Sequence, residues 1–214
     1  SDVLEATGCT VGVRDVSFEV LPGETFVVMG LSGSGKSTLV RCLSGLTDVT
    51  AGSVRIDGDD VTSMSSSQLR ALRRSKLSMV FQHFGLFPHR RVIDNAAFGL
   101  EVQGVSKVDR RARALEVLEI VGLAGFEQHY PQQLSGGMQQ RVGLARAIAV
   151  DPEVLFFDEP FSALDADNRL RALDFVKNVA TRHSRAIIAV SHNPSDVADL
   201  SAEALDLSKT LVST

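Results

Sequence analysis

Residues 30–37 read Gly-Leu-Ser-Gly-Ser-Gly-Lys-Ser and match the pattern G-x-x-x-x-G-K-[ST]. A continuously apolar run, residues 25–29, precedes them, and a segment with helical spacing follows as far as about Leu46. Glycines in such a loop allow successive backbone N–H groups to point at phosphate oxygens, and the positive end of the following helix adds to the attraction. The order of strand, glycine loop and helix therefore predicts a binding site for the phosphates of a nucleoside triphosphate.

Two side chains of this loop have the chemistry that such a site needs. Lys36 supplies a full positive charge, and the hydroxyl of Ser37 can ligate Mg²⁺. A glycine turn that merely packs is the alternative, but the complete pattern in this context disfavours it. The residues expected to contact the nucleotide here are Gly30, Leu31, Ser32, Gly33, Ser34, Gly35, Lys36, Ser37 and Thr38.

Acidic residues follow a second apolar run. Residues 154–157 read Val-Leu-Phe-Phe, and Asp158 and Glu159 come directly after them. Ligands of parallel sheets collect at the carboxyl ends of the strands. Asp158 therefore suits the Mg²⁺ shell, and Glu159 suits the task of polarising an attacking water. Acidic pairs are common on protein surfaces, so this pair becomes a candidate site only because it lies downstream of the phosphate loop.

Two further side chains follow apolar runs. Gln82 comes after residues 77–81, and its amide can contact Mg²⁺ or the water; a solvated loop glutamine is the alternative. His192 comes after the apolar residues 186–190. A neutral imidazole at this point can contact the γ-phosphate and orient Glu159.

A second phosphate-facing sequence lies at residues 134–140, which read Leu-Ser-Gly-Gly-Met-Gln-Gln. Ser135 is a natural N-cap for the helix that follows, and Gly136 and Gly137 let a phosphate approach the positive end of that helix. One nucleotide is already surrounded on one side by the loop with Lys36. A second chain is therefore the expected recipient of this helix end.

Composition restricts the class of protein. The chain has 214 residues, 44% of them hydrophobic and 22% charged, with a formal net charge of −4. Such a balance argues against nucleic acid as the main partner. No apolar stretch approaches the roughly 20 residues that cross a bilayer, and the N-terminus lacks a signal pattern, so a cytoplasmic location is expected. The two cysteines, Cys9 and Cys42, lack metal-ligand spacing.

Strand and helix patterns alternate along the chain, which predicts a single α/β domain over residues 1–214. Residues 13–20 alternate like a half-buried strand, with Val16, Phe18 and Val20 on one face. Ser65 and Gln68 fit a capping box at a helix start. Helical spacing covers 106–121, through Val108, Ala112, Leu115 and Leu118, and also 135–150. With no strand between these two helices, we expect a helical subdomain, residues 83–150, inserted into the core.

Together these motifs closely resemble the ATP-binding cassette family, and the resemblance also covers the run Ser-Ala-Leu-Asp at residues 162–165. It implies a P-loop NTPase core with an antiparallel β edge, and ATP with Mg²⁺ as ligands. It also implies two chains arranged head to tail. Each ATP would lie between the P-loop of one chain and Ser135, Gly137 and Gln140 of the other, with Asp165 near the joint.

Residues 29–36, 79–84 and 134–146 are similar to the ATPase subunits of importers for glycine betaine, proline and related quaternary amines. In such importers the segment after Gln82, about 84–98 here, receives a helix of the permease. Phe84, Leu86 and Phe87 would line that groove, or would fill the core of the helical subdomain instead.

Several residues depart from the family pattern. Residues 7–13 offer no aromatic to stack on adenine, which leaves Val11 as the candidate contact. Asn193 stands where an acid usually follows the histidine. The regulatory domain of some relatives would lie beyond Thr214, so the resemblance leaves open whether the full-length protein has one.

The resulting hypothesis is an ATP-hydrolysing subunit, peripheral on the inner face of the cell membrane, that powers uptake of glycine betaine, proline or a related quaternary amine. Its partners would be permease subunits and, indirectly, a substrate-binding protein. An importer for another polar amino acid remains open. The rival is a soluble cassette ATPase that acts as a mechanical switch on nucleic acid or ribosomes, against which the acidic balance counts. A regulator without turnover is disfavoured by Glu159 and His192.

Overall fold

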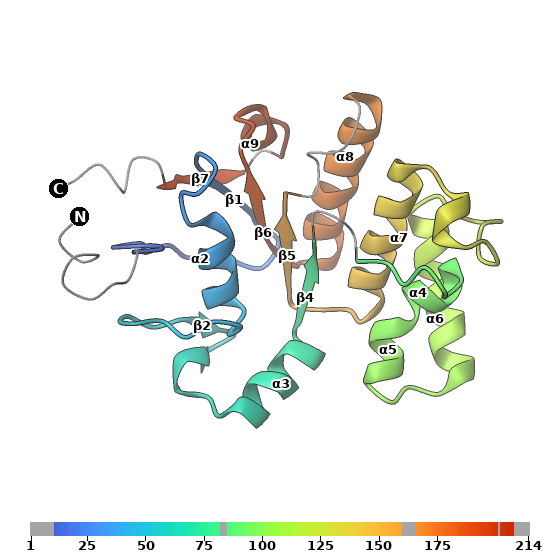
Figure 1. Ribbon diagram of the computed structural model, residues 1–214, viewed down its shortest axis with the longest axis horizontal. Coiled ribbons are helices and arrows are strands. Elements are labelled where there is room, and N and C mark those ends of the chain that lie inside the picture. Colours follow the sequence, from blue (N-terminus) through green and yellow to red (C-terminus); the bar gives the residue numbers. More distant parts are fainter. Residues whose placement is uncertain (1–10, 82–84, 160–165, 201, 208–214) are drawn as a thin grey trace.

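The computed structural model of the chain describes residues 11–81, 85–159, 166–200 and 202–207. A five-stranded sheet in the order β4-β5-β6-β1-β7 runs through the middle, with helices on both faces (Figure 1). Every neighbouring pair in this sheet is parallel. Its strands are β1 (Thr25–Met29), β4 (Leu77–Val80), β5 (Val154–Asp158), β6 (Ala186–Ser191) and β7 (Glu203–Asp206).

The helices of the described residues surround this sheet. They are α2 (Lys36–Leu43), α3 (Ser66–Ser75), α4 (Val92–Ala96), α5 (Phe98–Val102), α6 (Lys107–Ile120), α7 (Gly136–Ala149), α8 (Ala166–His183) and α9 (Ser195–Leu200), with short 3₁₀ turns at Val61–Ser63 and Pro131–Gln133. Within the described ranges, no helix has both the length and the apolar character that a membrane span requires.

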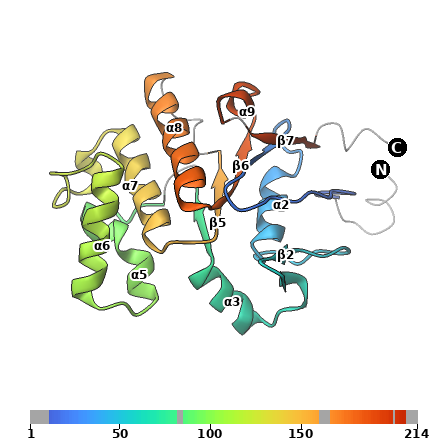
Figure 2. The same cartoon turned by 180° about the vertical axis from the view of Figure 1, so that it is seen from behind.

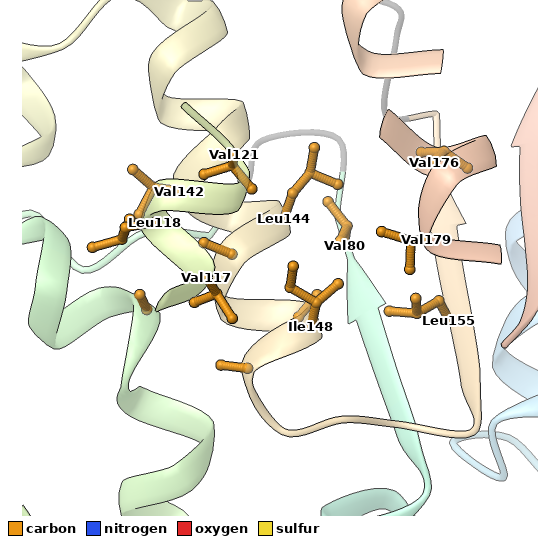
Figure 3. Close-up of a cluster of buried hydrophobic side chains, with 14 of the residues drawn as sticks. Val80, Val117, Leu118, Val121, Val142, Leu144, Ile148, Leu155, Val176 and Val179 are labelled. Atoms are coloured by element: carbon orange, nitrogen blue, oxygen red, sulfur yellow. The ribbon is translucent and has the colours of Figure 1, made fainter. Parts of the chain in front are cut away.

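Alternating side chains of the strands divide the interior into two cores. On β1, Val27 belongs to the core beneath α4 to α8, whereas Phe26 and Val28 belong to the core beneath α2 and α3. The same alternation separates Leu155 from Phe156 on β5. Figure 3 shows the first core: Leu144 and Ile148 of α7 face Val80 of the sheet, with Val176 and Val179 of α8 beyond it.

Most of the predicted elements are confirmed, several with nearly the predicted bounds. The capping box is present: Gln68 N donates to Ser65 Oγ at 3.4 Å, and Ser65 N donates to Gln68 Oε1 at 2.8 Å. The helix after the phosphate loop ends at Leu43, earlier than predicted. Gly45 has a φ of 64°, and Leu46 N donates to Arg41 O at 2.8 Å, which closes the helix by a left-handed C-terminal turn.

The strand predicted at residues 13–20 is wrong, although its pattern of burial is right. Val16, Phe18 and Val20 are half-buried against the core beneath α2, and the Phe18 ring stacks on Phe26 at 4.5 Å between centroids. Asp15 has a φ of 51°, which interrupts an extended run, and the described residues 11–20 form no ladder.

Antiparallel pairing within the described residues lies instead in a small hairpin of β2 (Arg55–Ile56) and β3 (Asp59–Asp60). Its turn residues, Asp57 and Gly58, have φ values of 51° and 81°. Asp-Gly is a favoured sequence for such a two-residue turn, so the sequence itself carries the signal for this hairpin.

The helix at 106–121 is confirmed as α6, but of the four apolar residues that indicated it only Leu118 lies on its buried face. Val108 is 78% exposed and Leu115 47%, whereas Ala114, Val117 and Leu118 are fully buried. Packing against α4 and α7 therefore buries the face of α6 that carries Ala114, Val117 and Leu118. Helices α4 to α7 gather beyond the β4 edge of the sheet (Figure 1), and the division of the chain at residues 83–150 stays a prediction.

Asn95 of α4 holds residues 87–91, which follow Gln82 in the sequence. Its side chain is fully buried, Oδ1 accepts from Phe87 N at 2.8 Å, and Nδ2 lies 3.1 Å from Phe87 O and 3.0 Å from Arg90 O. A buried amide with its hydrogen bonds satisfied fixes the backbone that it contacts. The path of residues 87–91 therefore depends on Asn95.

Asn95→Ala should lower the free energy of unfolding by about 2 kcal/mol or more, because each buried group left unpaired costs roughly 1–3 kcal/mol. Urea denaturation measures it. The control is Asn178→Ala on the exposed face of α8, where the side chain donates to Asp174 O within its own helix. Equal, small losses for both variants would show that Asn95 does not hold the segment.

Candidate nucleotide site

The parallel register brings three sequence-distant segments to one edge of the sheet. Met29, the last residue of β1, pairs with Ser191 of β6, and Asp158 of β5 pairs with Val190 of β6. The residues that follow these strand ends, Gly30, Glu159 and His192, therefore emerge side by side.

The phosphate loop has a backbone that requires glycine at two points. Gly35 caps α2 with a φ of 90°, and a Cβ there would lie 1.9 Å from Gly12 O. Gly30 has a φ of 152°, and a Cβ there would lie 2.4 Å from Ser34 Oγ. The loop therefore brings its own backbone close together at the start of α2, as a phosphate cradle needs.

Two polar groups inside the loop fit an anion. Lys36 is 5% exposed, and its Nζ donates to Gly30 O at 2.7 Å and Leu31 O at 2.8 Å, which leaves one of three N–H groups for another acceptor. Ser34 Oγ is buried and has no hydrogen-bond partner among the described residues. An unpaired buried hydroxyl is costly, and a phosphate oxygen would satisfy it.

The predicted ligands of Mg²⁺ lie together. Ser37 Oγ donates to Asp158 Oδ1 at 3.2 Å, a bond that joins the first turn of α2 to the end of β5. A hydroxyl and a carboxylate oxygen at this separation suit a hard cation. The third predicted ligand, Gln82, lies outside the described residues.

Glu159 is held in an uncommon backbone conformation. Its φ is 49°, in the left-handed region that residues other than glycine seldom occupy, and its N–H donates to Val190 O at 3.2 Å. His192 Nδ1 lies 3.8 Å from Glu159 Oε2. The Glu159 side chain is 26% exposed and that of His192 59%, so both can reach a ligand at this edge.

The second phosphate-facing sequence, residues 134–140, lies away from the phosphate loop. Ser135 caps α7, with its Oγ accepting from Met138 N at 3.3 Å, and Ser135 and Gly136 are exposed. Figures 1 and 2 both show α7 and α2 at opposite sides, with β5, β6 and α8 between them. One chain does not bring Ser135–Gly137 to its own phosphate loop. Gln140 is 1% exposed, which does not support its predicted contact with a second chain.

The remaining predicted contacts divide into two groups. Val11 is 40% exposed. It precedes Gly12, which lies next to Thr38 of α2, so Val11 lies near the phosphate loop. Asp165 and the rest of residues 162–165 lie outside the described residues.

Sequence reasoning missed a group of polar residues next to His192. Ser191, Arg169 and Asp196 form a hydrogen-bonded network beneath the turn that carries the histidine. Asn193, which replaces the usual acid, accepts from Ser195 N at 3.1 Å through its Oδ1, so the amide oxygen caps the turn as a carboxylate would. Tertiary contact between α8 and α9 brings Arg169 to this group, and no local pattern marks it.

Residues 13–162 match the sequence model of the family described as ABC transporter. The chain is 56% identical over 90% of its length to the glycine betaine transport ATP-binding protein OpuAA of Bacillus subtilis, covering 46% of that protein. It is 52% identical over 90% of its length to the trimethylamine N-oxide transport ATP-binding protein TmoW of Ruegeria pomeroyi, covering 56%. The chain thus spans about half the length of these curated relatives.

Solved structures agree with the sequence match. A dimeric ATP-binding cassette in a post-hydrolysis state, bound to ADP and phosphate, superposes with a TM-score of 0.79 at 33% identity, over 88% of this chain and 83% of that one. The fold, the family match and the relatives converge. The chain belongs to the ABC transporter family.

Proposed function

We propose that the chain binds ATP with Mg²⁺ and hydrolyses it to drive an importer for glycine betaine or a related quaternary amine. The observation that carries the proposal is the convergence at one sheet edge of the phosphate loop, the Ser37–Asp158 pair and the Glu159–His192 pair. Lys36 and the loop N–H groups hold the phosphates, and Ser37 and Asp158 hold the cation. Mg²⁺ would neutralise charge that develops on the phosphates.

Glu159 is the carboxylate placed to act on the water. Its left-handed backbone turns the residue away from the strand at the point where β5 ends, so Asp158 and Glu159 serve different parts of one ligand. His192, with Nδ1 3.8 Å from Glu159 Oε2, orients that carboxylate or contacts the terminal phosphate. Proton transfer by such a positioned group contributes typically about 10²–10⁴ in rate.

Two chains would complete each site. The exposed start of α7 offers a helix N-terminus with small residues to the phosphates of a neighbour. The structural relative is described as a dimer with ADP and phosphate, which supports the same assembly here.

A permease would contact the surface beside α4 and α5. An open cavity of about 260 Å³ there is lined by His89, Arg90, Arg91, Asp94, Glu101 and Tyr130. Of the predicted apolar cluster, Leu86 packs against the core, the Phe87 ring lies 4.5 Å from that of Phe98, and Phe84 lies outside the described residues. Arg146 of α7 donates to Gly85 O at 2.7 Å, so this surface is tied to the helix that Ser135 begins.

The names of the relatives support the proposed substrate. Those described above are named for transport of glycine betaine and trimethylamine N-oxide, which supports a small amine carrying methyl groups. A position on the inner face of the membrane and a separate substrate-binding protein belong to the same proposal. The relatives give no support to a switch acting on nucleic acid or ribosomes.

Glu159→Gln should keep ATP binding and lower turnover by about 10² or more, since it removes a positioned proton acceptor. Lys36→Ala should weaken binding itself by removing a charge-assisted contact. Phosphate release and nucleotide titration separate the two effects. Glu153→Gln, the same change just before the other end of β5, should hydrolyse ATP at the wild-type rate. Wild-type turnover in Glu159→Gln would contradict the assignment.

Ser135→Arg should abolish hydrolysis while leaving the first nucleotide contact nearly intact, because the arginine blocks the neighbour's phosphate pocket. Mixing Ser135→Arg chains with Lys36→Ala chains should restore one intact composite site per mixed dimer, detected as occluded ATP. Ser106→Arg, a change at the matching N-cap of α6, controls for the lost cap. An active Ser135→Arg chain, or no occlusion in the mixture, would rule out the shared site.

Arg91→Glu should uncouple the chain from a permease, because it reverses an exposed charge on the cavity wall. In proteoliposomes with permease and binding protein, glycine betaine should stimulate wild-type hydrolysis but not that of the variant, whose basal rate stays unchanged. Arg70→Glu on the exposed face of α3 is the matched control. Stimulation of the wild type by proline but by no quaternary amine would overturn the substrate class, and normal coupling in Arg91→Glu would overturn the docking surface.

A further inference from the structure

A buried carboxylate lies beneath the turn that carries His192. Asp196, in the first turn of α9, has a side chain only 3% exposed. Ser191 Oγ donates to its Oδ2, and Arg169 Nη2 of α8 donates to its Oδ1. A buried charge is costly unless it is paired and hydrogen-bonded, and both conditions hold here.

This carboxylate fixes the backbone on both sides of the histidine. Ser191 immediately precedes His192, and its Oγ accepts from the N–H of Asn193, which immediately follows it, at 3.0 Å. A single hydroxyl thus joins the two neighbours of His192 to Asp196. Its donation to Asp196 orients the lone pair that receives the Asn193 N–H.

Arg169 anchors the network to a separate element. Its Nη2 also lies 2.6 Å from Ser195 Oγ and 3.2 Å from Asp199 Oδ2, and the arginine side chain is 18% exposed. An apolar pair would join α8 to α9 with equal or better stability than a buried ion pair. What the ion pair adds is a defined orientation of the carboxylate toward Ser191.

We propose that Asp196 and Arg169 are positioning residues that hold the His192 turn so that the imidazole stays in reach of Glu159, an inference that rests on the proposed ATP hydrolysis. Asp196 is buried, and both residues act through Ser191. Disturbing either residue should therefore slow turnover without changing ATP affinity. A displacement of about 1 Å at a reacting group can cost as much as 10²-fold in rate.

A double-mutant cycle on turnover separates positioning from stability. Asp196→Asn keeps the shape of the side chain and removes its charge. It should lower kcat about tenfold, equivalent to about 1.4 kcal/mol, with KM for ATP unchanged. In the His192→Ala background the same change should have no further effect. Equal losses in both backgrounds would assign Asp196 a purely structural role and overturn the proposal.

Two further variants keep the test decisive if Asp196→Asn folds poorly. Ser191→Ala removes the hydroxyl but leaves the Arg169–Asp196 pair, and it should reproduce the loss in kcat. Asp151→Asn breaks an exposed ion pair, 2.6 Å from Asp151 Oδ1 to Arg185 Nη2, near the opposite end of β6. It should leave kcat unchanged.

A readout independent of turnover distinguishes this inference from the proposed function. The ring resonances of His192, assigned by loss of signal in His192→Ala, should shift in Ser191→Ala and Asp196→Asn but not in Asp151→Asn. Unshifted resonances would overturn the positioning role. Shifted resonances in a chain whose wild type hydrolyses no ATP would instead leave the positioning role standing and remove the proposed function.

Discussion

Parallel pairing of β1, β5 and β6 determines where the candidate reactive groups of the chain lie. Met29 pairs with Ser191 and Asp158 with Val190, so the loop with Lys36, the carboxylates and His192 all begin at one level of the sheet. A slip of one residue would turn Phe26 and Phe156 toward the wrong core and separate Ser37 from Asp158. The hydrophobic alternation that builds the two cores is therefore the same property that aligns the site.

That alignment also leaves the site open on one side. The groups that could grip phosphates come from β1, β5 and β6, while the start of α7 lies beyond β5 and α8 (Figure 1). No rearrangement within the sheet could carry α7 past the intervening layer without unpacking Leu144 and Ile148 from the core. Completion by another copy is the physically cheaper arrangement, and it explains why a helix with an exposed cap and adjacent glycines faces solvent.

Features set by neighbouring residues could be predicted from the sequence, whereas features set by tertiary packing could not. The strand at 25–29, the capping box at Ser65 and the caps at Ser106 and Ser135 follow from short-range rules, so they were predictable. The strand expected at 13–20 failed because one positive φ at Asp15 interrupts it, which alternation does not reveal. The choice of the buried face of α6 was set by packing against α4 and α7, and two faces of the helix carry apolar residues. The Arg169–Asp196 pair joins residues far apart in sequence, and no motif marks it.

In the proposed assembly, one chain builds the phosphate grip and a second chain closes it. Sedimentation of the Glu159→Gln chain, with and without ATP and Mg²⁺, tests it most directly, because slow turnover preserves the closed state. We expect monomers without nucleotide, and with nucleotide we expect dimers that retain one ATP per chain. A chain that binds ATP stoichiometrically yet stays monomeric at every concentration and at every Mg²⁺ level would contradict the account.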